Sequence, residues 1–304
     1  MAANLYKNQS ENITKTWILM SMFFVLIMFL GWFASYYFGN ALIFYFALAF
    51  SVIMPIISYW NSASIVLKIS GAKPASKEEY YDLYTLTENL SITAGLPMPK
   101  IYVMHDPVPN AFATGRNKEH GVVAVTTGLL EILDRTELEG VIAHELAHIG
   151  NRDILLQTVV VVLVGLVTLL ADLFIRATFF GGSDNKGGKA GGILLIIGII
   201  LMILSPIIAT IIQLMISRKR EYLADATGAL LTRYPEGLAS ALEKISGYSG
   251  GRKMKKANHA TAHMFFASPF GEHSKKHKGF MNSLFSTHPP VEKRIENLRG
   301  IEIK

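Results

Sequence analysis

The sequence predicts a mainly α-helical integral membrane protein with four transmembrane helices and a polar α+β part that contains a small antiparallel sheet. Three observations support this fold class. Of the 304 residues, 51% are apolar and only 17% are charged. The apolar residues are concentrated in long runs, several of which exceed the roughly 20 residues that cross a bilayer. The segments between and after these runs show the helix and strand patterns of a folded domain.

The first apolar stretch covers residues 16–67 without a charged residue. It is long enough to cross the hydrocarbon core twice at roughly 20 residues per crossing. Gly39 and Asn40 mark the reversal, and aromatic residues lie near the ends as they do at membrane interfaces. We therefore predict an N-terminal segment at 1–16 and a transmembrane hairpin at 17–60. A cleaved signal peptide is the alternative, but its apolar core has only about 7 to 15 residues.

The segment after this hairpin predicts a helix followed by short strands. SKEEYYDLYTLTENLSITAGLPMPK has Ser76 as a candidate N-cap and Gly95 as a stop, so an amphipathic helix is expected. IYVMH, NAFATG and GVVAVTTG are typical of strands separated by turn signals, which favours a small antiparallel sheet. Thr136 with Glu139 fits a capping box, so the next helix should begin there and end near Gly150.

A second pair of apolar runs follows at 154–175 and 190–217. We predict a second transmembrane hairpin at 154–217 with a glycine-rich outer loop at 176–192. A buried helical hairpin of the soluble part is the alternative. Residues 218–304 then complete the polar domain and begin with a helix over SRKREYLADATGALLTRY.

The basic residues predict the orientation in the membrane. If all four runs cross, all but three of the 29 lysines and arginines lie on the side of the N-terminus. By the positive-inside rule the polar parts at 61–153 and 218–304 are cytoplasmic, and the protein is expected to be multi-pass in the plasma (inner) membrane. The lack of cysteine fits a reducing compartment and excludes thiolate metal ligands. The basic segment 252–278 is predicted to be a solvated loop, with attraction to anionic lipid as the alternative. No nucleic-acid partner is expected.

The motif HELAH at 144–148 lies on a predicted helix and is typical of a metal site. His144 and His148 lie one turn apart on the same face, so both can bind one ion. Glu145 projects sideways from this pair and can accept a proton from a water molecule beside the ion. The metzincin pattern is excluded, because Asn151 and Ile154 stand where it requires glycine and a third histidine.

The third ligand must come from another helix, and EYLAD supplies candidates. Glu221 completes a set of two histidines and one glutamate, which is typical of catalytic zinc, whereas closed structural sites use four protein ligands. Asp225, one turn later, can accept a hydrogen bond from a histidine N–H and fix its tautomer. Asn151 is predicted to lie in the same outer layer of the site, with a helix C-cap as the simpler interpretation.

Four motifs give the chain a resemblance to a known family. They are HELAHIGNRD at 144–153, NAFATG at 110–115, REYLADATG at 220–228 and FSTHPPVEKRI at 285–295, which occur among four apolar runs. With these motifs the chain resembles the HtpX-type membrane zinc metalloproteases, which are gluzincins related to the CaaX prenyl proteases. The resemblance implies a gluzincin-type zinc peptidase domain and endoproteolysis of damaged or misfolded membrane proteins, as part of protein quality control and the stress response.

The same resemblance implies the roles of individual residues. It implies one Zn²⁺ per chain, bound by His144, His148 and Glu221, with Glu145 as the catalytic base. His288 in THPP would donate to the oxyanion, with an ordinary turn residue as the alternative. The NAFATG strand would align an extended substrate, with a purely structural strand as the alternative. The contact residues there would be Asn110, Ala111, Phe112 and Ala113.

The position of the motifs predicts where such an enzyme works. The HELAH helix leads into the third apolar run, and the fourth run leads into the helix that carries Glu221. We therefore expect a site at the inner membrane surface, where membrane-protein or unfolded polypeptides leave the lipid bilayer. The alternatives are a zinc-binding scaffold with a vestigial site, which the intact Glu145 disfavours, and a channel or transporter, which the scarcity of intramembrane charge disfavours. The oligomeric state stays open.

Overall fold

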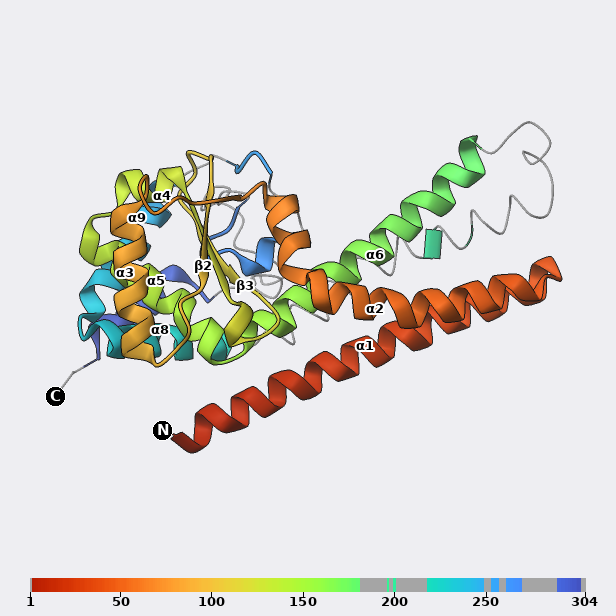
Figure 1. Ribbon diagram of the computed structural model, residues 1–304, viewed down its shortest axis with the longest axis horizontal. Coiled ribbons are helices and arrows are strands. Elements are labelled where there is room, and N and C mark those ends of the chain that lie inside the picture. Colours follow the sequence, from red (N-terminus) through yellow and green to blue (C-terminus); the bar gives the residue numbers. More distant parts are fainter. Residues whose placement is uncertain are drawn as a thin grey trace.

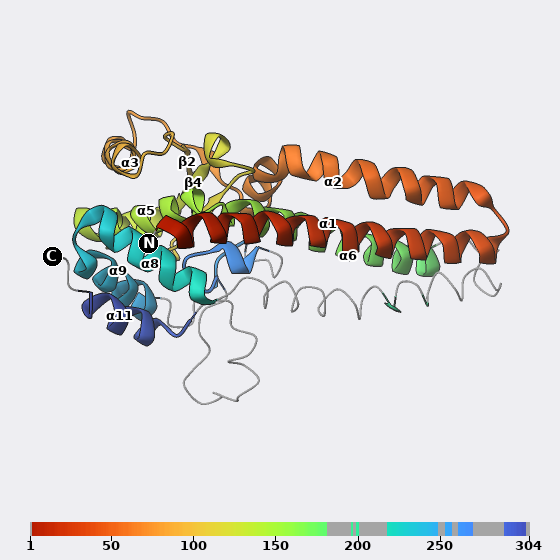
Figure 2. The same cartoon turned by 90° about the horizontal axis from the view of Figure 1, so that it is seen from below.

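Two parts make up the structure, a polar body and a set of long helices that project from it (Figures 1 and 2). The coordinates are a computed structural model that describes residues 2–180, 196, 199–200, 218–248, 253–256, 261–269 and 289–301. Within these residues the protein is mainly helical with a four-stranded mixed sheet. Most of the predicted outer loop 176–192 and of the fourth apolar run lies outside the described residues.

The long helices are α1 (Ala2–Phe38), α2 (Ala41–Ser70) and α6 (Asp153–Phe180). The turn between the first two has Gly39 at φ 62° and Asn40, whose side chain accepts a hydrogen bond from the backbone N–H of Leu42. The helices approach closely, since a Cβ on Gly31 would lie 2.2 Å from that of Ala47. A shared apolar core joins all three helices.

Large apolar side chains on the outer faces of these helices are exposed, including Trp17, Trp32, Phe46 and Trp60. Among the described residues, Asn12–Tyr36 is by length and composition sufficient to cross a membrane. Two further candidates are pairs of helices joined at a sharp bend, Ala41–Ile57 with Tyr59–Ser70 and Arg135–Gly150 with Asp153–Leu163. If each pair counts as one crossing, the described residues contain up to three candidate crossings. Four crossings are therefore not confirmed, because all but three residues of the fourth predicted run lie outside the described part of the chain.

The sheet contains β1 (Lys73–Pro74), β2 (Lys100–Met104), β3 (Ala111–Thr114) and β4 (Val122–Thr126) in the order β1-β2-β4-β3. The strands predicted from sequence correspond to the last three, but the prediction of an antiparallel sheet was wrong. β2 and β4 are parallel, whereas the other two pairs are antiparallel. The reason is that β3 and β4 form a hairpin whose second strand returns between β2 and β3, which leaves β3 at the edge.

The helices of the body pack around α5 (Arg135–Gly150), which is buried along most of its length. Its neighbours are α3 (Tyr81–Ala94), α8 (Arg218–Thr232) and α9 (Pro235–Tyr248), while α4 (Thr127–Ile132) follows the sheet and α11 (Val291–Arg299) packs on α9. Short 3₁₀ turns lie at Lys118–His120 and Ala262–Met264.

Two predicted helix starts are displaced in the structure. The capping box of α5 is formed by Asp134 and Glu137, not by Thr136 and Glu139. Asp134 accepts hydrogen bonds from the backbone N–H groups of Thr136 and Glu137, so Thr136 is already inside the helix. The hydroxyl of Ser76 accepts from the N–H of Glu79, but this bond stabilises a turn and α3 begins only at Tyr81.

Two glycines set the close packing around α5. A Cβ on Gly228 of α8 would lie 3.1 Å from the backbone nitrogen of His144, and one on Gly140 would lie 2.7 Å from that of Leu238 in α9. The missing side chain at Gly228 therefore lets α8 lie directly against α5 beside the HELAH motif. This contact brings Glu221 and Asp225 to the histidines.

We expect Gly140→Ala to destabilise the body. The added methyl group meets the backbone of α9, which cannot rotate away, and overpacking of this kind costs roughly 1–3 kcal/mol. Gly247→Ala on α9 is the matched control, because a Cβ there has open space and alanine favours a helix. Thermal unfolding of the detergent-solubilised variants measures the difference, and equal midpoints for both variants would contradict the packing argument.

Candidate metal centre

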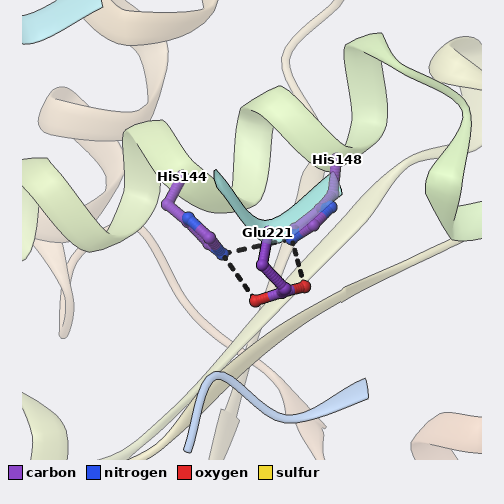
Figure 3. A group of neighbouring side chains, drawn as sticks. All are labelled: His144, His148 and Glu221. Atoms are coloured by element: carbon purple, nitrogen blue, oxygen red, sulfur yellow. Dashed lines mark hydrogen bonds and ion pairs between the residues drawn. The ribbon is translucent and has the colours of Figure 1, made fainter. Parts of the chain in front are cut away.

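Three side chains converge between α5 and α8 (Figure 3). His144 Nε2 and His148 Nε2 lie 3.1 Å apart. Glu221 faces both, with its carboxylate oxygens 3.9 Å from the first nitrogen and 3.6 Å from the second. One ligand atom from each residue lies within 4.8 Å of the others, and all three side chains are buried. A single cation at the centre would be in reach of all three.

Two outer carboxylates orient the imidazoles. Asp225 Oδ1 lies 3.0 Å from Nδ1 of His144, and Asp153 Oδ2 lies 2.9 Å from Nδ1 of His148. A carboxylate at Nδ1 holds the proton on that nitrogen and leaves the Nε2 lone pair available. When both imidazoles are neutral, both Nε2 lone pairs and the carboxylate of Glu221 face one point, so a cation there would find three ligand atoms. Without a cation, a proton on Nε2 of His148 can bridge the two nitrogens at this distance.

Burial and local charge perturb the two histidines in opposite directions. Burial lowers the pKa of His144 to about 4 despite the nearby Asp225, so its imidazole is neutral at pH 7, as a metal ligand must be. Burial also lowers the pKa of His148, but the hydrogen bond to Asp153 and the charge of Glu221 outweigh it and raise the pKa to about 9. Metal binding by His148 therefore releases a proton.

Glu145 lies beside this cluster and is almost fully buried. Burial raises its pKa to about 7, while the backbone N–H of Ala113 on β3 donates a hydrogen bond to its carboxylate. A carboxyl group with a pKa near 7 can both accept and return a proton at neutral pH, which is the property a general acid–base residue requires. The contact also fixes the edge strand next to the reacting groups.

The sequence analysis missed Arg294 on α11. Its Nε and Nη2 donate to the two carboxylate oxygens of Asp225 at 2.9 and 2.7 Å, and Nη1 lies 3.7 Å from Glu221. Its side chain is 1% exposed and lies over the ring of Phe266. The sequence contained a sign that Arg294 is buried, because this residue interrupts the apolar helix face formed by Val291, Ile295 and Leu298.

Asp153 was also missed, although it stands in the HELAHIGNRD motif. It is buried at the first turn of α6 and lies 3.3 Å from Nη1 of Arg220. Arg220 belongs to the REYLADATG motif, and the structure places it in an ion pair with Asp153. A charged residue that directly precedes an apolar run was the signal for Asp153.

Asn151 is the C-cap of α5, and its backbone N–H donates to the carbonyl of Ala147. Its side chain is buried, and its Nδ2 has no hydrogen-bond partner among the described residues. Asn151 therefore occupies the helix C-cap position that the sequence analysis gave as its simpler interpretation, next to the turn into α6. His288 lies outside the described residues.

The predicted substrate strand, β3, is an edge strand of the sheet. In this structure the segment 265–267 of the same chain lies against it. The carboxamide of Asn110 bonds both the carbonyl and the N–H of Ala267, and Phe266 donates its N–H to the carbonyl of Ala111 at 2.8 Å. Phe112 packs edge-on against Phe265 at 5.2 Å. The ring of Phe266 lies 5.1 Å from that of His144 and covers this side of the cluster.

The two histidines of α5 and the glutamate of α8 lie within a segment that matches a known protein family. Residues 77–302 match the model of Peptidase family M48. The chain belongs to this family. The expected resemblance to HtpX-type metalloproteases is thereby confirmed, and the M48 assignment covers every described member of the cluster.

Curated members of the family match the chain over nearly its full length. It is 47% identical over 305 residues to "Protease HtpX homolog" of Caldanaerobacter subterraneus subsp. tengcongensis, with 98% of each chain covered. It is 46% identical over 302 residues to the protein of that name from Thermoanaerobacter pseudethanolicus, again with 98% of each covered. Among solved structures, S. mikatae Ste24p matches with a TM-score of 0.49 and 19% identity, covering 96% of this chain and 67% of that one.

Membership of this family establishes the class of activity. The chain is a membrane metalloprotease, and its substrates are polypeptides. A vestigial scaffold is not favoured, since the M48 region is present together with the complete cluster of His144, His148 and Glu221. The metal that the family implies finds a fitting donor set in that cluster.

Proposed function

We propose that this M48 member is a zinc-dependent endopeptidase whose metal ligands are His144, His148 and Glu221. The convergence of these three buried side chains on one point supports the proposal. Two imidazoles and one carboxylate with room for a fourth group are typical of catalytic zinc, and cysteine-rich closed sites are excluded by composition. When bound, zinc would supply Lewis-acid polarisation of the scissile carbonyl.

The other side chains of the site are proposed to transfer protons, orient the metal ligands and bind the oxyanion. Glu145 accepts a proton from the attacking water and returns it to the leaving amine, as its pKa of about 7 permits. Asp225 and Asp153 hold the two imidazoles in the orientation that presents Nε2. His288 is proposed to donate to the oxyanion, and Asn151 to support the turn between the metal-binding helix and α6.

We propose that an extended substrate adds to the edge of β3 through Ala111 and Ala113, with Asn110 and Phe112 shaping the strand. Backbone pairing of this kind gives affinity with little dependence on sequence, which suits unfolded polypeptides. Phe266 donates to Ala111 in this structure, so a substrate strand pairs there only after Phe266 has moved. The same movement uncovers the imidazole of His144.

The organisation predicted from sequence supports a site at the cytoplasmic membrane surface. We propose a cytoplasmic segment at 1–16, membrane hairpins at 17–60 and 154–217, and cytoplasmic peptidase parts at 61–153 and 218–304, in the plasma (inner) membrane. Asp153, which bonds His148, is the first residue of α6, and α5 meets α6 at 81°. The proposed substrates are misfolded or damaged membrane proteins, cut close to the lipid bilayer during protein quality control.

A reconstituted assay tests this proposal. In liposomes, the purified full-length protein should cleave a co-reconstituted, destabilised membrane protein and lose this activity in a chelator. Stoichiometric zinc should restore it, with one ion per chain. Cleavage that survives complete removal of metal would contradict the zinc mechanism. Cleavage of a soluble unfolded protein such as casein, but never of the embedded one, would contradict the membrane substrate.

A further inference from the structure

The first membrane helix contributes a side chain to the surroundings of the metal ligands. Asn12 lies on α1, a few residues before the first apolar run, and its polar side chain is only 2% exposed. Its Nδ2 donates to Asp153 Oδ1 at 2.8 Å and to the carbonyl of Asn151 at 3.2 Å. Its Oδ1 accepts a hydrogen bond from Nη1 of Arg220. Both N–H groups and the oxygen of this amide are therefore engaged.

The partner of Asn12 is the carboxylate that orients His148. Asp153 uses Oδ2 for Nδ1 of His148 at 2.9 Å, and its other oxygen faces Asn12 and Arg220. All of these side chains are at least nine-tenths buried, so water does not replace a lost contact. The three segments that meet here are α1, the first turn of α6 and the first turn of α8, which are distant in sequence.

The chemistry of an amide suits this position better than that of a charged or an apolar group. Asp153 and Arg220 are 3.3 Å apart, so the pair needs a neutral bridge that donates to the carboxylate and accepts from the guanidinium. A second acid would add an unpaired buried charge, and an apolar side chain would remove the hydrogen bonds that Asp153 and Arg220 make with Asn12.

We propose that Asn12 is a positioning residue that acts through Asp153 on His148, so that the first membrane helix controls the geometry of the metal site. α1 also packs along α6 through apolar residues that include Leu19 and Phe23. A shift of α1 against α6 therefore displaces Asn12 relative to Asp153. This inference rests on the proposed metal ligands, and it gives α1 a part in the chemistry in addition to anchoring.

A purely structural role for Asn12 predicts a different result from a positioning role. A structural contact affects thermal stability and yield, whereas a positioning residue also affects metal affinity and the coordination geometry. Cobalt(II) reports the latter, because its visible absorption depends on the number and arrangement of its ligands. Loss of an outer-layer partner of a metal-binding histidine typically weakens metal affinity about 10–100-fold.

The test uses full-length protein in detergent and two variants of Asn12. Asn12→Leu removes every polar contact, and Asn12→Asp keeps the shape and the acceptor for Arg220 but loses the donor to Asp153. Because Asn12 acts one step further out, through Asp153, we expect both variants to bind zinc about 10-fold more weakly in chelator competition, at the lower end of that range. Both should also alter the cobalt spectrum and lower kcat at saturating zinc with little change in KM. Asn61→Leu is the matched control, because the exposed side chain of Asn61 bonds, within the described part of the chain, only the carbonyl of Ile57 on its own helix.

The possible outcomes are distinguishable. If either folded Asn12 variant binds zinc with the affinity of the parent and gives its cobalt spectrum, the positioning role is wrong. If Asn12→Leu does not fold, the isosteric Asn12→Asp variant decides alone. If the parent protein itself binds neither zinc nor cobalt, the proposed metal ligands are wrong, which is a separate failure. An equal loss of affinity in Asn61→Leu would show a general effect on the membrane helices and would also overturn the inference.

Discussion

Glu145→Gln is expected to retain the metal and to lose peptide-bond cleavage. Glutamine has nearly the shape of glutamate and still accepts the N–H of Ala113 through its amide oxygen, so the site should keep its geometry. It has no basic oxygen for the proton of the attacking water, and removal of a general base costs about 10²–10⁴-fold in rate. Metal content and cleavage rate, measured on the same preparation, provide the test.

Two matched variants complete this experiment. His144→Ala removes a ligand, so it should lose both the metal and the activity. Glu139→Gln makes the same chemical change on the same helix away from the cluster, so it should retain both. A Glu145→Gln enzyme that cleaves at the rate of the parent would exclude Glu145 as the base. One that loses its metal would instead indicate that Glu145 helps to hold the ion.

The proposed metal ligands could be predicted because their geometry is local. His144 and His148 are one helical turn apart, and a helix places such residues on one face whatever surrounds it. Glu221 and Asp225 repeat the same spacing on a second helix. Residue types made the EYLAD helix a candidate for the third ligand, and the resemblance to a family supported its pairing with the HELAH helix. The physical cause of that pairing includes Gly228, whose missing side chain allows the contact with His144.

Beyond Asp225, which its spacing from Glu221 suggested, the outer layer could not be predicted in the same way. Asp153, Asn12 and Arg294 reach the site from three different elements, and no spacing in the sequence connects them. The strand order failed for a similar reason. Short runs between turn signals identify β2, β3 and β4 as strands, but they do not show that β4 returns between the other two. The capping box moved by two residues because Asp134 accepts two N–H groups where Thr136 was expected to accept one.

The second large effect is expected at Arg294. Arg294→Met should destabilise the protein by roughly 3–5 kcal/mol, because it leaves the buried carboxylate of Asp225 without its bidentate partner and removes a cation next to Glu221. Methionine fills most of the space, so the loss reports the charge more than a cavity. Thermal or denaturant unfolding in detergent measures it. Lys293→Met is the matched control on the same helix, since Lys293 is exposed.

A double variant separates the ion pair from the fold of α11. Asp225→Asn removes the charge that Arg294 neutralises, so the effects of the two substitutions should be less than additive, with a coupling of roughly 0.5–3 kcal/mol. Strict additivity would mean that Arg294 stabilises the protein through other contacts, such as Phe266. Coupling has a consequence for the site. Arg294 contacts both oxygens of Asp225, and Oδ1 also faces His144, so α11, like α1, would then help to orient a metal ligand.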